Sequence, residues 1–340
     1  MTTQWLARPA ACGDMGQILS LVRLNPFDNV APILSREFWQ WKHMQSPFGA
    51  SPILVAESQG RIIGVRVFLR WAWQAGNRVV RAVRAVDTAT HPDWRGHDIF
   101  SQLTLRLVEQ MRTEGITFVF NTPNQDSRAG YLKMGWSQVT RIPVWVHALR
   151  PLRLLRSLFS GTWQDDNPSL GDQGGSVAAL LEDPRTGALL AQQQLPDTRY
   201  YTARTLDYLR WRYLAIPNFH YQARSLWEDE AGAAVIFLSK ERRGLRELSL
   251  SEILLSPGEA GLRVGRQLLR DVASEAQADY MVACSAQKTP EAAALTANGF
   301  MAIPGLGPHF TALPLNRCGE VSNPFLWENW RCSIGDLEIF

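Results

Sequence analysis

Apolar residues recur at two different spacings along the first half of the chain. Helical spacing predicts helices over 13–24, 35–44 and 99–113. Alternation of apolar and polar residues predicts strands over 53–57, 61–73 and 78–90. Shorter patterns predict a strand over 116–121, a helix over 127–134 and a strand over 136–149. Two helices, three antiparallel strands, a helix, a strand, a helix and a strand therefore follow one another, which indicates an α/β fold of the α+β kind.

Several polar residues and glycines define the ends of these elements. Ser35 precedes the second helix and can cap it, with Glu37 in the first turn. Gly135 is placed to end the helix before it. Within 78–90 the apolar positions change faces, so a β-bulge is expected in the strand that carries Asp87.

The second half of the chain repeats this order weakly. An aromatic-rich segment around Trp41 ends six residues later in Pro47, and one around Trp211 ends six residues later in Pro217. A helix over 259–277, a strand over 280–284, a helix over 290–297 and an alternating segment over 309–315 are predicted to follow. The shared order predicts a duplicated α/β unit. We expect a first domain over 1–150, a linker over 151–176, and a second domain over 177–340 that includes a C-terminal tail.

The segment 147–159 allows two interpretations. Arg150, Arg153 and Arg156 lie three residues apart among leucines. Such a basic amphipathic helix can lie on an anionic membrane surface, which would give a peripheral membrane contact. It can also be a linker helix that packs on the protein.

Composition narrows the function classes. The 340 residues are 46% hydrophobic and 20% charged, which suits a globular protein. The formal net charge of +3 gives no indication of a nucleic-acid partner. The four cysteines form no CxxC pair, which argues against a disulfide framework, and the six scattered histidines predict no metal site. Neither a signal-peptide pattern nor a membrane-spanning run is visible, so we expect a cytoplasmic protein.

The loop over 91–98 lies between a predicted strand and a predicted helix. Backbone N–H groups at a helix N-terminus form a natural site for phosphate oxygens. Arg95 can add a charge-assisted bond, and Gly96 lets the backbone approach a ligand closely. An ordinary strand-to-helix turn would have the same sequence features.

A second motif follows, and with the loop it indicates a family. Asn124, Ser127, Tyr131 and Gly135 match the pattern Asn-x-x-Ser/Ala-x-x-x-Tyr-x-x-x-Gly-Phe, in which Trp136 stands at the position of the Phe. The loop from Arg95 is similar to the motif Arg/Gln-x-x-Gly-x-Gly/Ala. Over residues 5–148 the chain therefore resembles the GNAT N-acetyltransferase superfamily. It also resembles two-domain members from bacterial polysaccharide and cell-envelope pathways.

The resemblance implies two tandem GNAT-like domains, each a mixed, mostly antiparallel sheet flanked by helices. Acetyl-CoA or another acyl-CoA would be the cosubstrate, without a metal. Its pyrophosphate would be bound by the loop Arg95, Gly96, His97, Asp98, Ile99 and Phe100, and its pantetheine arm by Asn124 and Ser127. The activity would be direct N-acyl transfer to an amine, on a small metabolite or an amino sugar.

The resemblance also implies catalytic roles. Tyr131 would protonate the departing thiolate. Asp87 lies on the strand where the family often places the base that accepts the amine's proton, and Glu37 is the substitute candidate.

Two departures from the family pattern keep other functions open. Asp98 and Phe100 stand where small residues are usual, and an aspartate near pyrophosphate oxygens is repulsive. In the second half, 256–265 lacks the Arg-Gly pair, and Leu295 and Lys288 stand where Tyr131 and Asn124 stand in the first. The second half is therefore expected to be noncatalytic. The alternatives are a degenerate GNAT-fold interaction or regulatory protein of an envelope polysaccharide pathway, and an aminoacyl-tRNA-dependent transferase.

Overall fold

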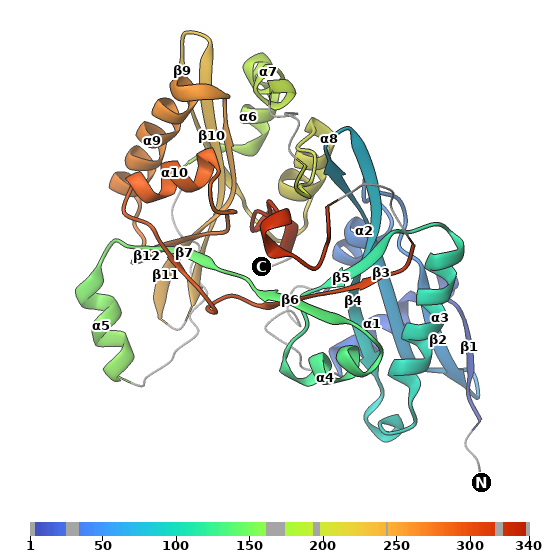
Figure 1. Ribbon diagram of the computed structural model, residues 1–340. Coiled ribbons are helices and arrows are strands. Elements are labelled where there is room, and N and C mark those ends of the chain that lie inside the picture. Colours follow the sequence, from blue (N-terminus) through green and yellow to red (C-terminus); the bar gives the residue numbers. More distant parts are fainter. Residues whose placement is uncertain are drawn as a thin grey trace. The chain divides into compact units, whose positions relative to one another are not determined.

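The computed structural model describes residues 4–24, 34–160, 174–192, 198–242, 244–316 and 322–337. They form two compact units (Figure 1). The first comprises 1–140, 216–218 and 309–325, and the second 141–215, 219–308 and 326–340. Each unit is built on a seven-stranded sheet in which antiparallel pairs dominate. The expected α+β class with two mixed, mostly antiparallel sheets is confirmed.

The first sheet has the strand order β1-β2-β3-β4-β5-β14-β6. Its strands are β1 (Leu6–Pro9), β2 (Ile53–Ser58), β3 (Arg61–Ala75), β4 (Arg78–Thr90), β5 (Phe118–Asn121), β6 (Ser137–Arg141) and β14 (His309–Pro314). The helices of this unit are α1 (Met15–Arg23), α2 (Arg36–His43), α3 (Ile99–Thr113) and α4 (Gln125–Lys133). Strands β4 and β5 run parallel, and α3 connects them. The sequence pattern missed β1, which is short and half-exposed.

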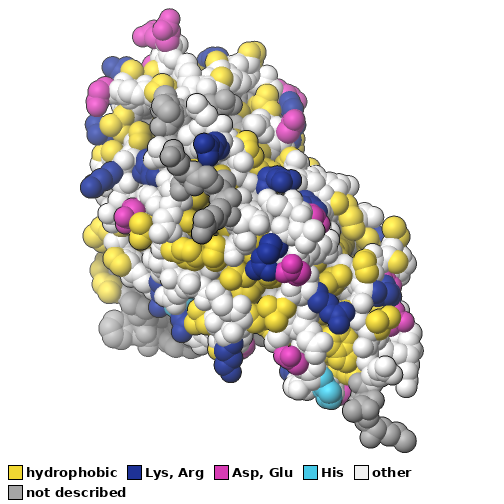
Figure 2. Space-filling view, turned by 45° about the vertical axis from the view of Figure 1, so that its right-hand side comes forward, with side chains coloured by type: hydrophobic (Ala, Val, Ile, Leu, Met, Phe, Trp, Pro, Cys, Tyr) yellow, Lys and Arg dark blue, Asp and Glu magenta, His cyan; other side chains and the backbone are white. Residues whose placement is uncertain are grey.

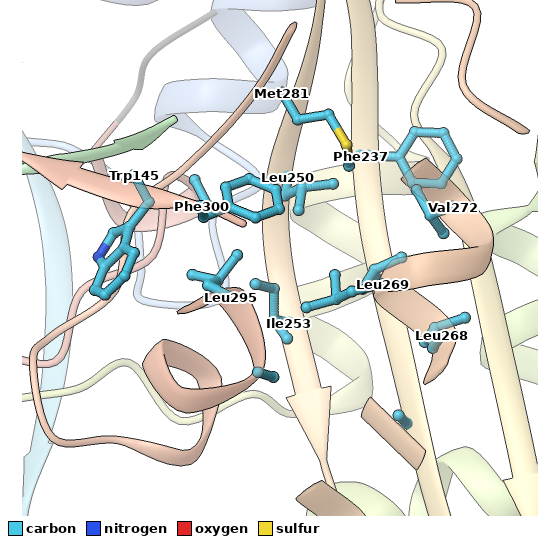
Figure 3. Packing of buried hydrophobic residues seen from close by; sticks show 14 of the residues in the cluster. Trp145, Phe237, Leu250, Ile253, Leu268, Leu269, Val272, Met281, Leu295 and Phe300 are labelled. Atoms are coloured by element: carbon cyan, nitrogen blue, oxygen red, sulfur yellow. The ribbon is translucent and has the colours of Figure 1, made fainter. Parts of the chain in front are cut away.

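The second sheet has the order β13-β7-β12-β11-β10-β9-β8. Its strands are β7 (Val144–Ala148), β8 (Gly175–Ser176), β9 (Gln222–Glu228), β10 (Ala231–Arg242), β11 (Leu245–Leu255), β12 (Tyr280–Ala283) and β13 (Met301–Ile303). The helices are α5 (Pro151–Ser160), α6 (Val177–Glu182), α7 (Pro184–Gln192), α8 (Leu206–Leu209) with a π-helical turn over Arg210–Leu214, α9 (Gly258–Glu275) and α10 (Pro290–Ala297). Apolar side chains from β10, β11, α9 and α10 form its core (Figure 3).

The two sheets exchange strands along the sequence. The segment 136–149, which the alternation pattern presents as one strand, is interrupted at Pro143. The part before it is β6 of the first sheet, and the part after it, β7, pairs with β12 and β13 of the second. In return β14, from near the end of the chain, pairs with β5 in the first sheet. The compact units are therefore interleaved along the chain, because alternation shows that a segment is a strand but not which sheet completes its hydrogen bonds. The domain ranges 1–150 and 177–340 stay a prediction.

The proposed linker range contains regular structure at both ends. Residues 151–160 form α5, and β8 pairs with β9, whereas 161–173 lie outside the described residues. Arg150 and Arg153 point to the buried carboxylate of Asp279, with Nη1–Oδ1 distances of 3.7 and 3.3 Å. These contacts attach the start of α5 to the protein, whereas Leu152 and Leu155 on the helix are exposed, and a membrane contact stays a prediction. None of the helices in the described ranges combines the length and the apolar character that crossing a membrane requires.

Local signals in the sequence act as expected. The Ser35 hydroxyl accepts the Phe38 N–H at 3.1 Å and caps α2, and Thr205 caps α8 in the same way by accepting the Tyr208 N–H at 3.1 Å. The α4 helix ends with the Trp136 N–H bonded to the Tyr131 carbonyl, and α10 ends with the Phe300 N–H bonded to the Leu295 carbonyl, both at 3.1 Å. The repeat seen in the sequence is therefore a repeat in the structure.

Candidate active site

The candidate site is centred on the predicted bulge in β4. Val67 pairs with Val86 and Val65 pairs with Ala89, so Arg66 on β3 faces two residues of β4 instead of one. One of these is Asp87, whose φ of +42° belongs to the left-handed region that aspartate tolerates better than most residues. Hydrogen bonding between β4 and β5 ends at Arg84 and Phe120, just before the bulge. The bulge therefore lies where these two parallel strands stop pairing.

The carboxylate of Asp87 is held by the end of α2. Its Oδ2 lies 2.6 Å from Lys42 Nζ and 2.9 Å from His43 Nε2, and His43 Nδ1 lies 3.1 Å from Ser51 Oγ. Lys42 is 5% exposed and His43 is fully buried. Burial by itself would raise the pKa of Asp87, but the Lys42 charge and the His43 hydrogen bond hold this pKa well below its usual range. Asp87 is thus a carboxylate that stays ionised at neutral pH.

Tyr131 is held on α4 by a second buried cation. Its side chain is 3% exposed, and its hydroxyl oxygen accepts a hydrogen bond from Arg66 Nη2 at 2.5 Å. The same guanidinium approaches the Val86 carbonyl through Nη1 at 3.5 Å, directly before Asp87 in the chain. Arg66 therefore connects the proposed acid, Tyr131, to the bulge that carries Asp87.

The loop before α3 has the form of an anion site. Arg95, Gly96, His97 and Asp98 are exposed, and Ile99 is buried in the core beneath them. Gly96 has a φ of +80° and open space where a Cβ would lie. Asp98 occupies the N-cap position with a φ of +59°, and its side chain makes no capping bond. The first N–H groups of α3 have no partner within the helix, so they are available to phosphate oxygens.

Phe100, Asn124 and Ser127 have local structural roles. The Phe100 ring packs against Tyr131 with centroids 5.4 Å apart, and a Cβ on Gly130 would lie 2.9 Å from it. Phe100 thus fills the space between α3 and α4. Asn124 Oδ1 accepts the Ser127 N–H at 2.9 Å and the Ser127 hydroxyl at 2.7 Å, which caps α4.

Glu37, the substitute base, lies apart from these contacts. It is exposed in the first turn of α2, and hydrogen bonds from its own backbone amide and from Ser35 lower its pKa. No motif in the sequence points to Lys42, Ser51 or Arg66, and His43 is one of six scattered histidines. The one local signal for Arg66 was a cation in the middle of an apolar strand.

These residues partly fit an acyl-CoA. The exposed loop and the unpaired amides of α3 suit a pyrophosphate, and the buried Arg66 and Tyr131 offer a cation and a hydroxyl to the thioester end. Against this, the Asp98 carboxylate is adjacent to the amides, and Phe100 occupies space between the helices. The donor set fits the group at the loop and at Tyr131. In the described ranges, no cluster of three or more His, Cys, Asp or Glu side chains is arranged to hold a metal.

The second unit has a related arrangement with a different outcome. Its sheet also has a bulge, in β11, where pairing with β10 shifts between Ile236 and Phe237; Ser251 is the extra residue there, and Glu252 beside it pairs with Ile236. The hydroxyl of Tyr213, from the π-helical turn, donates to Glu252 Oε1 at 2.7 Å. Leu295 occupies the position of Tyr131 and is fully buried. A small cavity of about 50 Å³ in this unit is lined by residues that include Arg204, Glu252, Cys284 and Ser333.

Comparison with known proteins supports the same family. Residues 8–139 match the family model of the acetyltransferase (GNAT) domain. This part of the chain is therefore similar to a GNAT acetyltransferase domain, and the two sheets give the chain a fold consistent with tandem GNAT-like domains. A search of curated protein sequences finds no match.

Several solved structures have a similar fold over most of this chain. A GCN5-related N-acetyltransferase from Anabaena variabilis superposes with a TM-score of 0.62 at 12% identity, over 92% of this chain and 73% of that one. A probable N-acyltransferase from Enterococcus faecalis gives 0.60 at 10% identity, over 92% and 73%. Eis1 from Mycobacterium abscessus gives 0.55 at 12% identity, over 92% and 74%. At such identities the likeness is one of fold.

Proposed function

We propose that the protein is an acyl-CoA-dependent N-acyltransferase, and that its first unit carries the reaction. The observation that supports this most is the pair of side chains at the β4 bulge. The buried hydroxyl of Tyr131 is bonded to Arg66, which also approaches the bulge at the Val86 carbonyl. The ionised carboxylate of Asp87 lies on the bulge and is held by Lys42 and His43. A proton donor and a proton acceptor at one point are what transfer from a thioester to an amine requires.

The cosubstrate would supply an acyl thioester that an amine can attack directly. The amides at the start of α3, with Arg95 and Gly96, are proposed to bind its pyrophosphate. The α4 N-terminus with Asn124 and Ser127 is proposed to contact the pantetheine arm, through backbone groups and the Asn124 amide nitrogen. The Asn124 oxygen already caps the helix.

The two proposed catalytic residues have separate tasks. Tyr131 would give its hydroxyl proton to the leaving sulfur. Asp87 would accept the proton that the amine loses, together with His43. Because the ion pair holds the pKa of Asp87 low, a proton taken up by this pair would reside on the imidazole rather than on the carboxylate.

The acceptor is proposed to be an amine of a small metabolite or an amino sugar. No structurally similar protein above is named for a polysaccharide or cell-envelope pathway, so that narrower link rests on the sequence resemblance alone. The tRNA-dependent alternative needs a basic surface. On the face shown in Figure 2, Lys and Arg side chains are interspersed with acidic and apolar ones. The net charge of +3 gives that alternative no support either.

Calorimetric titration with acetyl-CoA tests the proposed function. The set contains the wild type, Asn124→Ala, Asp98→Gly and Thr289→Ala. Thr289 accepts the Ala292 N–H at 3.1 Å and caps α10 in the second unit, so Thr289→Ala loses a helix cap of the same kind outside the proposed site.

We expect micromolar binding by the wild type, weaker binding by Asn124→Ala, and unchanged binding by Thr289→Ala. Tighter binding by Asp98→Gly would show that the loop carboxylate repels the cosubstrate. Binding that appears only in Asp98→Gly would favour the degenerate interaction protein. An equal loss in both cap variants would remove Asn124 from the site, and no binding by any variant would remove acyl-CoA from the proposal.

A further inference from the structure

Arg66 is a buried charge without a counter-charge. Its side chain lies on β3 with no measurable exposure, and no carboxylate in the described ranges forms an ion pair with it. Its Nε has no hydrogen-bond partner in the described part of the chain. The guanidinium carbon lies 5.1, 5.6 and 5.3 Å from the ring centroids of Phe68, Phe100 and Tyr131. An uncompensated ion in such a place destabilises a fold, and replacing it by an apolar side chain is often neutral or stabilising.

The hydrogen bond between Arg66 and Tyr131 can run in only one direction. A guanidinium has five N–H donors and no acceptor, so the phenolic oxygen must be the acceptor of the 2.5 Å bond. The hydroxyl proton of Tyr131 is therefore directed away from Arg66. A glutamine or a carboxylate in the place of Arg66 could instead accept a hydrogen bond from this hydroxyl and turn its proton away from a substrate.

We propose that Arg66 is a positioning residue that keeps Tyr131 a one-way proton donor and balances the charge left on it. This inference rests on the proposed function. In the step it serves, the amine nitrogen bonds to the acyl carbon and the carbon–sulfur bond breaks. Tyr131 gives its proton to the sulfur, and the amine gives one proton to the Asp87–His43 pair. The phenolate of Tyr131 then keeps the hydrogen bond from Arg66 until that proton returns to it through solvent.

Besides its bonds to Tyr131 and Val86, the contacts of the buried cation are with aromatic rings. These rings can also pack against the unbranched, adaptable side chain of a methionine. A purely structural Arg66 and a functional one therefore predict opposite effects on stability. If Arg66 serves only the reaction, its removal should not weaken the fold.

The first measurement is thermal unfolding of the ligand-free protein. We expect Arg66→Met, and the double variant Arg66→Met/Tyr131→Phe, to unfold at or above the wild-type midpoint. The matched control is Arg70→Met on the same strand. Its guanidinium pairs with Glu114 at 2.7 Å and is 28% exposed, so it should change little. A clear drop in the midpoint of the double variant would overturn the proposal, because it would show that the cation holds the fold together.

The second measurement compares CoA with desulfo-CoA, which lacks the sulfur, at a pH above the pKa of the free thiol. A Tyr131 hydroxyl directed at the thiolate should make the wild type bind CoA about tenfold more tightly than desulfo-CoA. Arg66→Met and Tyr131→Phe should each remove this difference while desulfo-CoA still binds. The double variant should lose no more than either single one, because the two side chains act as a unit.

The outcomes separate the two proposals. If CoA keeps its advantage in Arg66→Met, Arg66 does not position Tyr131, and the proposed function is untouched. If losses in the double variant add, the two residues act independently and the inference also fails. If the wild type binds neither CoA nor desulfo-CoA, the proposed function fails and the role of Arg66 fails with it.

Discussion

Each unit has an acidic side chain at a bulge in the strand that precedes its long helix, and the two units surround it differently. In the first, the α2 helix brings His43 Nε2 to 2.9 Å from Asp87 at the β4 bulge. In the second, the turn after α8 brings the Tyr213 hydroxyl to 2.7 Å from Glu252 at the β11 bulge. The capping residues Ser35 and Thr205 begin these two helices in the same way. The framework is therefore common, and the chemistry depends on which groups it presents.

In the second unit, residues of the same unit surround the acidic side chain of Glu252. Glu252 accepts hydrogen bonds from Arg204 and from Ser333, both at 3.0 Å, and Arg204 Nη2 also lies 2.8 Å from Asp336 Oδ2. A Cβ on Gly335 would lie 1.9 Å from the Tyr213 hydroxyl, so only glycine fits there. The C-terminal segment thus occupies the surroundings of Glu252. An acid in this place serves the packing of the second unit, and a GNAT-like fold by itself does not establish activity.

The two acids also differ in charge state. The Lys42 charge and the His43 hydrogen bond hold the pKa of Asp87 low despite its burial. Burial, with the Asp336 charge, raises the pKa of Glu252 above its usual value, although Arg204 opposes this. The surroundings of the bulge therefore lower the pKa of the acid in one unit and raise it in the other.

The largest expected effect is on the reaction rate, and it should differ between the two buried tyrosines Tyr131 and Tyr213. Tyr131→Phe should lower kcat by about 10²- to 10⁴-fold, because it removes the proposed proton donor. Tyr213→Phe removes a hydroxyl of the same kind from the second unit and should leave the rate unchanged. Initial rates of CoA release from acetyl-CoA with a saturating amine measure both. Equal losses in the two variants would contradict a catalytic first unit.

The next effect concerns stability. Asp87→Asn removes the carboxylate that contacts the buried Lys42 ammonium and should cost about 3–5 kcal/mol of the free energy of unfolding. Glu252→Gln leaves Arg204 paired with Asp336 and should cost only about 1–2 kcal/mol. Urea unfolding at neutral pH measures both changes. A greater loss in Glu252→Gln would reverse the assignment of the two acids.

The same two variants should respond to pH in opposite directions. A lowered folded-state pKa means that the Asp87 contribution is present above its unfolded pKa of about 4 and is lost as the pH falls through the folded value. A raised folded-state pKa means that the stability contributed by Glu252 is present below pH values of about 4.3, its unfolded pKa, and is lost as the pH rises through the folded pKa.

The measurement is the free energy of unfolding of the wild type minus that of each variant, followed from about pH 3 to about pH 8. The Asp87→Asn difference should grow with increasing pH, and the Glu252→Gln difference should shrink. Parallel slopes would show that the two bulges have the same electrostatic environment.

The smallest expected effect is a change in the free energy of unfolding when residues at the starts of α3 and α9 are replaced. Asp98 has a φ of +59°, and the second unit has Gly258 with a φ of +80° at the start of α9. Asp98→Gly should raise the free energy of unfolding by about 0.5–1 kcal/mol, and Gly258→Asp should lower it by a similar amount. Thermal unfolding of the two variants tests this. A destabilised Asp98→Gly would indicate that the Asp98 side chain has a structural role that the contacts of the loop do not reveal.

Much of the local structure could be read from the sequence. Ser35 and Gly135 define helix ends through hydrogen bonds within a few residues, so their effect depends little on the rest of the fold. The bulge at Asp87 was visible in the alternation of β4, and the register from Tyr131 to Trp136 recurs from Leu295 to Phe300. The element order and its repetition were therefore determined by the chain itself.

The partners of these elements depended on the tertiary structure. Thr311 on β14 bonds to Asn121 on β5 across 190 positions, and Arg66 meets Tyr131 across 65. Nothing local to either residue encodes such a pairing, because which strand completes a sheet depends on the burial and hydrogen bonding of the whole unit. The sequence by itself determined the family pattern, the helix ends and the tyrosine at the proposed site. Only the folded chain decided that a buried arginine holds that tyrosine, that Lys42 and His43 hold Asp87, and that the second unit encloses Glu252, since each of these follows from packing between distant segments.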